Sequence, residues 1–459
     1  MKNRSHRMND SDLFDELKSY AECGPVRFHM PGHKGMLQPD SILASLAPYD
    51  VTELSCTDDL NAPSGVIKRL EGRAAGLYQA RFSLILVNGS TSGNIAMLLS
   101  LGMNKKVLVA RNCHKSVLSG IALAGHEAVS IIPDSETGLV SPQDVEAGLN
   151  RCHADAVFIT SPTYYGLCSD VDGIAAVCHR FGAKLFVDAA HGAHFPFSDA
   201  LPNNPSASDA WVVSCHKTLN AYTQSAILNI GYSNDISAHE MQRFVSLVQT
   251  SSPSYLLMLS VENAIDNGGD WNRHCSRIVF FRRSLQEIEG VELVTSDEEF
   301  DITRVTVSVH GYSGYELQEI LEKHGVFVEM ADLRSVVLIT TPSDPSEWYC
   351  RFLRIIKAIS VKKKEIYINN LPSICNGETG ISIREAMLGK NELVALDASA
   401  GRISAQAVGI YPPGIATLFP GEVITNEEID YLKLCANHGA KLFGAYDERI
   451  IVYKEEANR

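Results

Sequence analysis

Short apolar runs alternate with helical segments between residues 82 and 231, and this alternation restricts the possible folds more than any other feature. Such an alternation is typical of a mostly parallel sheet that helices cover on both faces. We therefore expect an α/β fold. The expected strands are Phe82–Val87, Lys106–Ala110, Ala128–Ile132, Ala156–Thr160, Leu185–Val187, Ala210–Val213 and Ala226–Ile230. The expected helices between them include Ser92–Met103, Ser116–Ala124, Ser141–Arg151 and Val171–Phe181.

The length of 459 residues predicts two or three domains, because a single core rarely extends over so long a chain. We expect residues 1–75 to form an N-terminal arm at an interface, with a helix near Ser11–Cys23. Residues 76–290 would form the large domain, including connector helices after residue 236. Residues 291–459 would form a smaller α+β domain. Its expected elements are strands Val291–Val294, Arg304–Val309, Val326–Glu329 and Val336–Thr340, and helices Tyr315–Lys323 and Pro345–Ser360.

Composition excludes several classes of protein. The 40 basic and 54 acidic residues leave a net charge of −14, which argues against nucleic acid as a partner. The 11 cysteines form no C-x-x-C pair and no metal-ligand pattern, as expected of a reducing compartment and of a protein without a metal site. No secretory signal or membrane-spanning apolar run is visible, so a cytoplasmic location is expected.

A lysine and an aspartate each follow one of the expected strands. Lys217 comes just after Ala210–Val213, and Asp188 directly follows Leu185–Val187. Taken alone, Lys217 could be a solvated surface lysine, and Asp188 could simply cap the next helix. Together, however, they are the layout of a pyridoxal phosphate (PLP) enzyme. A partly desolvated amine can attack a carbonyl, and a carboxylate can face the pyridine nitrogen of PLP.

A glycine- and hydroxyl-rich run, Asn88–Asn94, joins the first expected strand to the helix after it. Glycines let the backbone approach an anion, and free N–H groups at a helix N-terminus bind phosphate. Ser90, Thr91 and Ser92 are therefore candidate phosphate ligands. The run lacks the Gly-Lys-Ser/Thr of a Walker loop, and an ordinary N-cap after a tight turn remains an alternative.

Other candidate cofactor contacts follow later strands. His114 could stack on a pyridine ring, although a helix cap or a core position is an alternative. Thr163 could bind the ring hydroxyl or simply belong to a turn. Ser214 and His216 flank Lys217 and could donate to the phosphate, and His191 would lie near the ring or the substrate carboxylate.

With these motifs the chain resembles the Orn/Lys/Arg decarboxylase family of fold type I PLP enzymes, in the shorter form found in Gram-positive bacteria. The shared motifs are Phe28–Gly35, Asp50–Glu53, Asp58–Leu60, Asn88–Asn94, Arg111–Ser116, Ala190–His194, Ser214–Leu219, Ser252–Met258 and Tyr411–Gly414. The resemblance implies an aspartate aminotransferase-like, mostly parallel sheet domain with a smaller C-terminal α+β domain.

The resemblance also implies roles for single residues. Lys217 would hold PLP as a Schiff base, Asp188 would pair with the pyridine nitrogen and His114 would stack on the ring. Ser90, Thr91, Ser214 and His216 would bind the phosphate. A homodimer or a dimer of dimers would form, with Ser252 and the N-terminal arm reaching the neighbouring subunit's site.

Some positions depart from the family pattern. Ala189 stands where members usually have glutamate, Asn220-Ala221-Tyr222 where Pro-Ala-Leu is usual, and Gln406 where many have glutamate. These departures leave the recognition of the substrate's distal end open, with Glu53, Asp58, Asp59 and Glu422 as candidate acids.

The function expected from this resemblance is decarboxylation of arginine, lysine or ornithine to the amine and CO2, in polyamine biosynthesis. Lys217 or His216 would return a proton to Cα. Two alternatives remain open: an aminotransferase or lyase of the same fold, and a catalytically silent regulatory homologue.

Overall fold

The computed structural model describes residues 12–296, 298–360, 377–412 and 414–455. Its largest sheet has seven strands in the order β1-β7-β6-β5-β4-β2-β3. They are β1 (Phe82–Leu86), β2 (Lys106–Ala110), β3 (Glu127–Ile131), β4 (Ala156–Thr160), β5 (Lys184–Asp188), β6 (Ala210–Ser214) and β7 (Ala226–Ile230). Among these strands β7 runs opposite to the others and pairs antiparallel with β1 and β6, and the remaining pairs are parallel. The expectation of a mostly parallel sheet is therefore confirmed, and every expected strand of this region forms.

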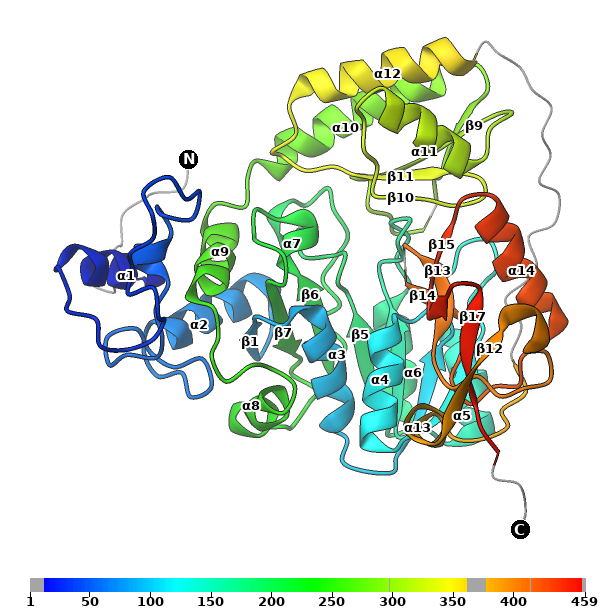
Figure 1. Ribbon diagram of the computed structural model, residues 1–459, viewed down its shortest axis with the longest axis horizontal. Coiled ribbons are helices and arrows are strands. Elements are labelled where there is room, and N and C mark those ends of the chain that lie inside the picture. Colours follow the sequence, from blue (N-terminus) through cyan, green and yellow to red (C-terminus); the bar gives the residue numbers. More distant parts are fainter. Residues whose placement is uncertain (1–11, 297, 361–376, 413, 456–459) are drawn as a thin grey trace.

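Helices cover both faces of this sheet (Figure 1). One face packs on α2 (Val66–Tyr78), α5 (Pro142–Cys152), α6 (Val171–Arg180) and α9 (Tyr255–Asp266), and the other on α3 (Gly89–Leu99), α4 (Lys115–Ala124) and α8 (Ala238–Ser246). Successive strand residues serve opposite cores: Ile85 joins the first and Leu86 the second. This alternation follows from the two-residue repeat of a strand, and it explains why the strands are apolar throughout.

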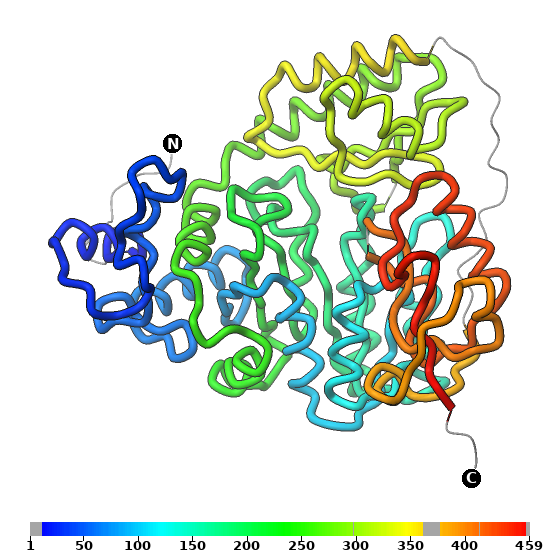
Figure 2. The backbone as a smooth tube through the Cα atoms, viewed as in Figure 1, coloured from blue at the N-terminus to red at the C-terminus, as the bar shows by residue number. Residues whose placement is uncertain are grey.

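The N-terminal arm lies at one end of the molecule, as the tube in Figure 2 shows in blue. It contains α1 (Leu13–Glu22), capped by Asp12, and a short 3-10 helix, η1 (Ala47–Tyr49). The helix expected near Ser11–Cys23 is thus confirmed, although Ser11 lies outside the described residues. Several apolar side chains of the arm face solvent, among them Phe28 at 94% and Ile42 at 91% exposure.

A second sheet, in the order β10-β11-β9-β8, has its own core. Its strands are β8 (Val291–Leu293), β9 (Arg304–Val309), β10 (Met330–Ala331) and β11 (Val336–Ile339), with α10 (Trp271–Gln286), α11 (Gly314–Lys323) and α12 (Ser346–Ser360) packed on it. The strand expected at Val326–Glu329 was wrong. These residues have high strand propensity, but the N–H of Val326 closes the end of α11 by donating to the carbonyl of Leu321. The N–H of Glu329 reaches the carbonyl of Val337 in β11, and the paired strand is limited to Met330 and Ala331.

The C-terminal residues form a third unit with a separate core. One small sheet joins β12 (Asn391–Ala395), β17 (Arg449–Tyr453) and β16 (Ala445–Tyr446), and another joins β14 (Ile415–Leu418), β13 (Val408–Tyr411) and β15 (Lys441–Phe443). The unit also contains α13 (Ile383–Leu388), η3 (Leu396–Ala398) and α14 (Asn426–Asn437). Residues 291–459 thus contain two cores, and the three domain boundaries expected from sequence stay a prediction.

A buried ion pair ties the C-terminal unit to the large sheet. Arg111, just after β2, is 0% exposed and donates two hydrogen bonds to the carboxylate of Glu422 and one, 3.0 Å long, to the carbonyl of Thr417. Its guanidinium also lies 4.3 Å from the ring centroid of Phe419. The loop after β2, which carries His114, is therefore fixed from both units.

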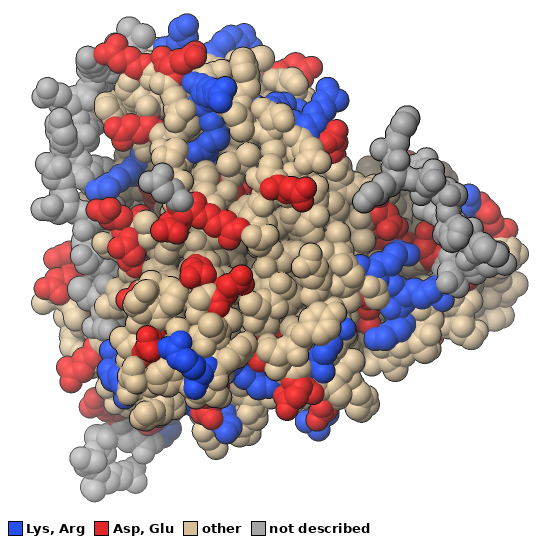
Figure 3. All heavy atoms as spheres, turned by 180° about the vertical axis from the view of Figure 1, so that it is seen from behind, with Lys and Arg blue, Asp and Glu red and all other residues tan. Residues whose placement is uncertain are grey.

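The surface carries mixed charges. Acidic and basic side chains are interspersed over the face shown in Figure 3. No helix within the described ranges combines the length and apolar character needed to cross a bilayer.

Candidate functional site

The predicted site residues meet at the carboxyl ends of neighbouring strands. Asp188 is the last residue of β5, and Lys217 lies in α7 (Cys215–Thr218), a short helix that directly follows β6. Strands β5 and β6 are adjacent and parallel, with Asp188 opposite Val212. The expected convergence of Lys217 and Asp188 at one edge of the sheet therefore agrees with the strand order.

Lys217 lies in a small group of rings. Its Nζ is 2.9 Å from Nε2 of His191 and 5.4 Å from the ring centroid of Tyr164. The ring centroids of His191 and Tyr164 are 4.1 Å apart, and His191 is only 2% exposed. Burial lowers the pKa of Lys217, and the neighbouring Asp188 carboxylate only partly opposes this. This environment favours an amine that loses its proton more readily than a surface lysine.

Asp188 is held as a buried acceptor. It is 4% exposed, its Oδ2 accepts a 2.7 Å hydrogen bond from Nδ2 of Asn94, and its Oδ1 accepts one of 3.1 Å from the N–H of Ala190. Nδ2 of Asn94 also donates to the hydroxyl of Ser116. Asn94 belongs to the Asn88–Asn94 run, but the sequence did not indicate its role as a partner of Asp188. These contacts fix the orientation of the carboxylate.

The N-terminus of α3 has the features of an anion site. Asn88 makes no side-chain cap, and the N–H of Gly89 donates to the carbonyl of Gln224, 2.8 Å away. The next two N–H groups, those of Ser90 and Thr91, have no backbone acceptor among the described residues and stay open to an anion. The buried hydroxyl of Ser214, at the end of β6, has no hydrogen-bond partner among the described residues. The hydroxyl of Ser92, by contrast, donates to the carbonyl of Gly89 and turns back into the helix.

The second glycine of this run has a packing role. An added Cβ at Gly93 would lie 2.6 Å from Cγ2 of Val212 and 3.0 Å from Cδ1 of Leu86. The sequence interpretation gave the glycines of this run to the approach of an anion. At Gly93 the structure gives another reason, since its lack of a side chain lets α3 lie directly on β6 and places the N-terminus of α3 near Ser214.

His114 is the N-cap of α4. Its Nδ1 accepts a hydrogen bond of 3.2 Å from the N–H of Ser116, and its backbone pairs with Ile415 in the C-terminal unit. The ideal Cβ position of Gly414 is 3.5 Å from the His114 ring, so Gly414 lies beside it. Burial lowers the pKa of His114, which favours a neutral ring. The helix-cap alternative therefore holds, and its stacking role stays a prediction.

The remaining predicted residues differ in position. Nδ1 of His216 donates to the carbonyl of Ser225, 3.1 Å away. Thr163 lies in a tight turn after β4, where its hydroxyl accepts the N–H of Leu167. Ser252 lies in the exposed loop between α8 and α9, and no hydrogen bond within the described residues links it to the other site residues. Its predicted role in a neighbouring subunit is not tested within one chain.

Sequence reasoning missed a buried arginine that enters the site from the second sheet. Arg304, at the start of β9, is 1% exposed, and its Nη2 is 3.2 Å from Nδ1 of His191. Its Nε and Nη1 are buried and have no hydrogen-bond partner among the described residues. Its only sequence signal was its position at the first residue of an expected strand, which does not distinguish it from other arginines.

Glu329 was missed as well. It lies in the bend before β10, and its carboxylate makes no hydrogen bond or ion pair with any residue that the structure describes. It acts electrostatically on four groups of the site: Lys217, His216, Arg304 and Tyr164. From the sequence, Glu329 is expected to be the last residue of a strand. The chain bends there instead, and no sequence pattern indicated that the bend would place Glu329 near the site.

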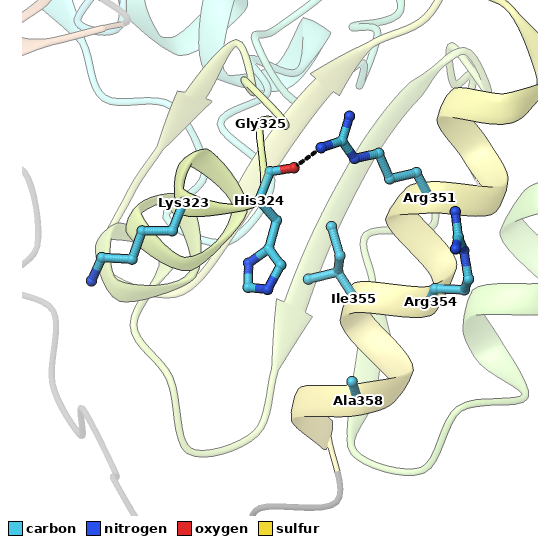
Figure 4. Close-up of a pocket in the computed structure, with 7 residues that line it drawn as sticks. All are labelled: Lys323, His324, Gly325, Arg351, Arg354, Ile355 and Ala358. Carbon is cyan, nitrogen blue, oxygen red and sulfur yellow. Dashed lines mark hydrogen bonds between the residues drawn. The ribbon is translucent and has the colours of Figure 1, made fainter.

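A separate surface pocket of about 470 Å³ lies between the end of α11 and α12 (Figure 4). It contains none of the residues of the site. Its basic groups already have partners: Arg351 donates to the carbonyl of His324, His324 contacts that of Ile320, and Lys323 pairs with Glu319. Arg351 and His324 satisfy the carbonyls at the C-terminal end of α11, which gives them a structural role without a ligand.

Comparison with known proteins shows likeness over nearly the whole chain. The family described as Orn/Lys/Arg decarboxylase matches with its major domain at residues 11–298 and with its C-terminal domain at residues 376–457. An uncharacterized Bacillus subtilis protein, YaaO, is 32% identical over 97% of this chain and 99% of its own length. The arginine decarboxylase of Bacillus subtilis is 30% identical, over 96% of this chain and 97% of its own.

Solved structures agree in fold. Lysine decarboxylase A from Pseudomonas aeruginosa superimposes with a TM-score of 0.81 at 17% identity, covering 97% of this chain and 80% of that one. The constitutive lysine decarboxylase of Escherichia coli gives a TM-score of 0.79 at 19% identity, over 96% and 82%. The predicted fold class is confirmed.

Proposed function

The chain belongs to the Orn/Lys/Arg decarboxylase family, and on that premise we propose that it decarboxylates a basic amino acid with PLP as cofactor. The products would be CO2 and the corresponding amine. The observation that carries the proposal is the convergence of a lysine of lowered pKa and a buried aspartate at the ends of β6 and β5.

The residues present fit PLP. Lys217 would bind its aldehyde carbon. The oriented carboxylate of Asp188 suits a protonated ring nitrogen, because Asn94 and the N–H of Ala190 hold it in place. The open N-terminus of α3 and the unpartnered hydroxyl of Ser214 suit a phosphate.

The chemistry then divides between the cofactor and the chain. When bound, PLP supplies a sink for the electron pair that the departing CO2 leaves on Cα. Asp188 would keep the ring nitrogen protonated, which strengthens that sink. Lys217 or His216 would return a proton to Cα.

Arg304 offers hydrogen-bond donors and a positive charge to the carboxylate of the substrate. Its Nε and Nη1 are buried without a partner among the described residues, so a carboxylate bound there would satisfy two donors. This contact would orient the carboxylate, and with it the bond that breaks. Orientation of this bond separates decarboxylation from the other reactions open to a PLP enzyme.

Glu329 is the acid that we propose for the cationic end of the substrate. Three of the acids named from the sequence are engaged in other contacts. Asp59 accepts the N–H of Asn61, and Glu422 pairs with Arg111. Asp58 accepts three backbone N–H groups at the start of α2; burial raises its pKa, but these hydrogen bonds outweigh burial and lower it. The fourth, Glu53, accepts the hydroxyl of Thr52, and its Oε1 is buried without a partner among the described residues. The Glu329 carboxylate is free of such contacts with the described residues and acts on Lys217 and Arg304. It could therefore replace the acids that this chain lacks at Ala189 and Gln406.

A dimer is proposed for the assembly, with the cytoplasm as the expected location. The exposed apolar side chains of the arm, such as Phe28 and Ile42, are typical of a surface that packs on another subunit. Sites at the interface would give Ser252 its predicted role. Light scattering of the purified protein would test this, and a monomer at working concentrations would contradict it.

The decisive experiment uses protein supplied with PLP and a panel of arginine, lysine, ornithine and neutral amino acids. We expect CO2 and amine from a basic member. Lys217→Ala should lose both turnover and the visible absorbance of bound PLP, while Lys323→Ala, an exposed lysine of α11, should keep both.

Other outcomes separate the alternatives. Keto acid without CO2 would indicate an aminotransferase of the same fold. Colourless protein that does not respond to added PLP would indicate a catalytically silent homologue. Full activity of Lys217→Ala would refute the proposed role of this lysine.

A further inference from the structure

His191 lies between two nitrogen groups of different kinds. Its Nε2 is 2.9 Å from Nζ of Lys217, and its Nδ1 is 3.2 Å from Nη2 of Arg304. His191 and Arg304 are 2% and 1% exposed, and they come from different sheets, since His191 follows β5 and Arg304 begins β9. The imidazole therefore forms a bridge from the guanidinium to the amine.

The donor and acceptor rules allow one arrangement of hydrogens on this bridge. A guanidinium only donates and keeps its charge, so Nδ1 of His191 has to accept and carries no hydrogen. The hydrogen of a neutral imidazole is then on Nε2, where it points toward Nζ of Lys217. An ammonium group has no lone pair to accept this hydrogen, whereas an uncharged amine has one.

We propose that Arg304, acting through His191, holds Lys217 as an uncharged amine in the cofactor-free protein. Arg304 and His191 are positioning residues in this arrangement. An uncharged amine is the form that attacks an aldehyde, so the site is ready to take up its cofactor before the cofactor arrives. The inference deepens the proposed function, but its test needs neither cofactor nor turnover.

The charges around the site agree with this arrangement. Burial lowers the pKa of Lys217, and Arg304 acts in the same direction. Burial and Arg304 hold the pKa of His191 well below its usual range, so the ring is neutral. The carboxylates of Asp188 and Glu329 oppose the effect on Lys217 and raise its pKa in part. The titratable or charged groups that face it are His191, Asp188, Arg304, Glu329, Tyr164, His114 and His216.

The test measures the charge of Lys217 directly by trace acetylation of cofactor-free protein over a range of pH. Only the uncharged amine reacts: its nitrogen attacks one carbonyl of acetic anhydride, acetate leaves, and the nitrogen loses a proton. Peptide mass spectrometry then gives a separate pH profile for each lysine. The exposed Lys323 serves as the internal reference, and Arg351→Met, an exposed arginine of α12, serves as the control variant.

We expect the midpoint of the Lys217 profile to lie below that of Lys323 by at least about one pH unit, a tenfold difference in uncharged amine. Arg304→Met and His191→Phe should both move it upward, so that acetylation at neutral pH falls about tenfold. His191→Gln should keep the low midpoint, because an amide can accept from Arg304 and donate to Lys217. Arg351→Met should change nothing.

Two results would overturn the inference. One is a wild-type Lys217 midpoint equal to that of Lys323. The other is a Lys217 midpoint that rises in Arg304→Met but not in His191→Phe. The charge of the guanidinium would then act on Lys217 directly and not through His191. If Arg304→Met does not fold, the comparison of His191→Phe with His191→Gln tests the inference, and equal Lys217 midpoints in these two variants would overturn it. Protein that binds no PLP but shows the low midpoint would refute the proposed function and leave this inference standing.

Discussion

Replacing Arg111 by methionine should strongly destabilise the contact between the C-terminal unit and the large sheet. The guanidinium is 0% exposed and makes two hydrogen bonds to Glu422 and one to the carbonyl of Thr417. Methionine fills a similar space but leaves Glu422, which is 6% exposed, with the N–H of Phe419 as a remaining donor. Removing one partner of a buried ion pair costs about 3–5 kcal/mol.

The assay is urea unfolding of cofactor-free protein, with Arg111→Met, Glu422→Leu and the double variant measured together. Glu428, 7% exposed, also lies 3.9 Å from Nη2 of Arg111 and keeps its carboxylate in every variant. Arg111→Met leaves two buried carboxylates without their cation and the double variant leaves one, so we expect the double variant to be more stable than Arg111→Met. This non-additivity is the signature of an uncompensated charge. A loss of less than about 1 kcal/mol for Arg111→Met, or a double variant equal to the sum of the single ones, would refute the reasoning.

Two further predictions concern buried positions. Burial raises the pKa of Glu71 from 4.5 to about 7, so its contribution to stability is complete below pH 4.5 and is lost as the pH rises to about 7. That difference amounts to about 3 kcal/mol at most; Glu71→Gln should remove this decline in pH-dependent unfolding, and parallel curves for the two proteins would contradict it. Gly93→Ala should cost about 1–3 kcal/mol and weaken PLP binding, because its Cβ would lie 2.6 Å from Val212. Gly72→Ala in α2, where a Cβ meets nothing within 4 Å, should be neutral or stabilising by up to about 1 kcal/mol, and equal effects at both glycines would count against the packing argument.

The large sheet was predictable because its signals are local. Each strand is a short apolar run bounded by polar residues, and Lys106–Ala110, Ala156–Thr160 and Ala226–Ile230 form with the expected ends. Such runs are apolar because both faces of the sheet are covered. The motif residues followed these runs, so their place at the carboxyl edge was predictable too. The expected strand at Val326–Glu329 failed because Val326 completes the end of α11 and the pairing with β11 begins only at Met330, neither of which strand propensity records.

The sequence by itself determined the class of fold, the family and the position of Lys217 and Asp188 at the ends of two strands, since these depend on residue type and spacing along the chain. Only the tertiary structure decided what surrounds them. Arg304 reaches His191 from another sheet, 113 residues along the chain, and Arg111 meets Glu422 across 311 residues. Contacts over such distances depend on how separate cores pack together, and no local pattern of the chain records that packing.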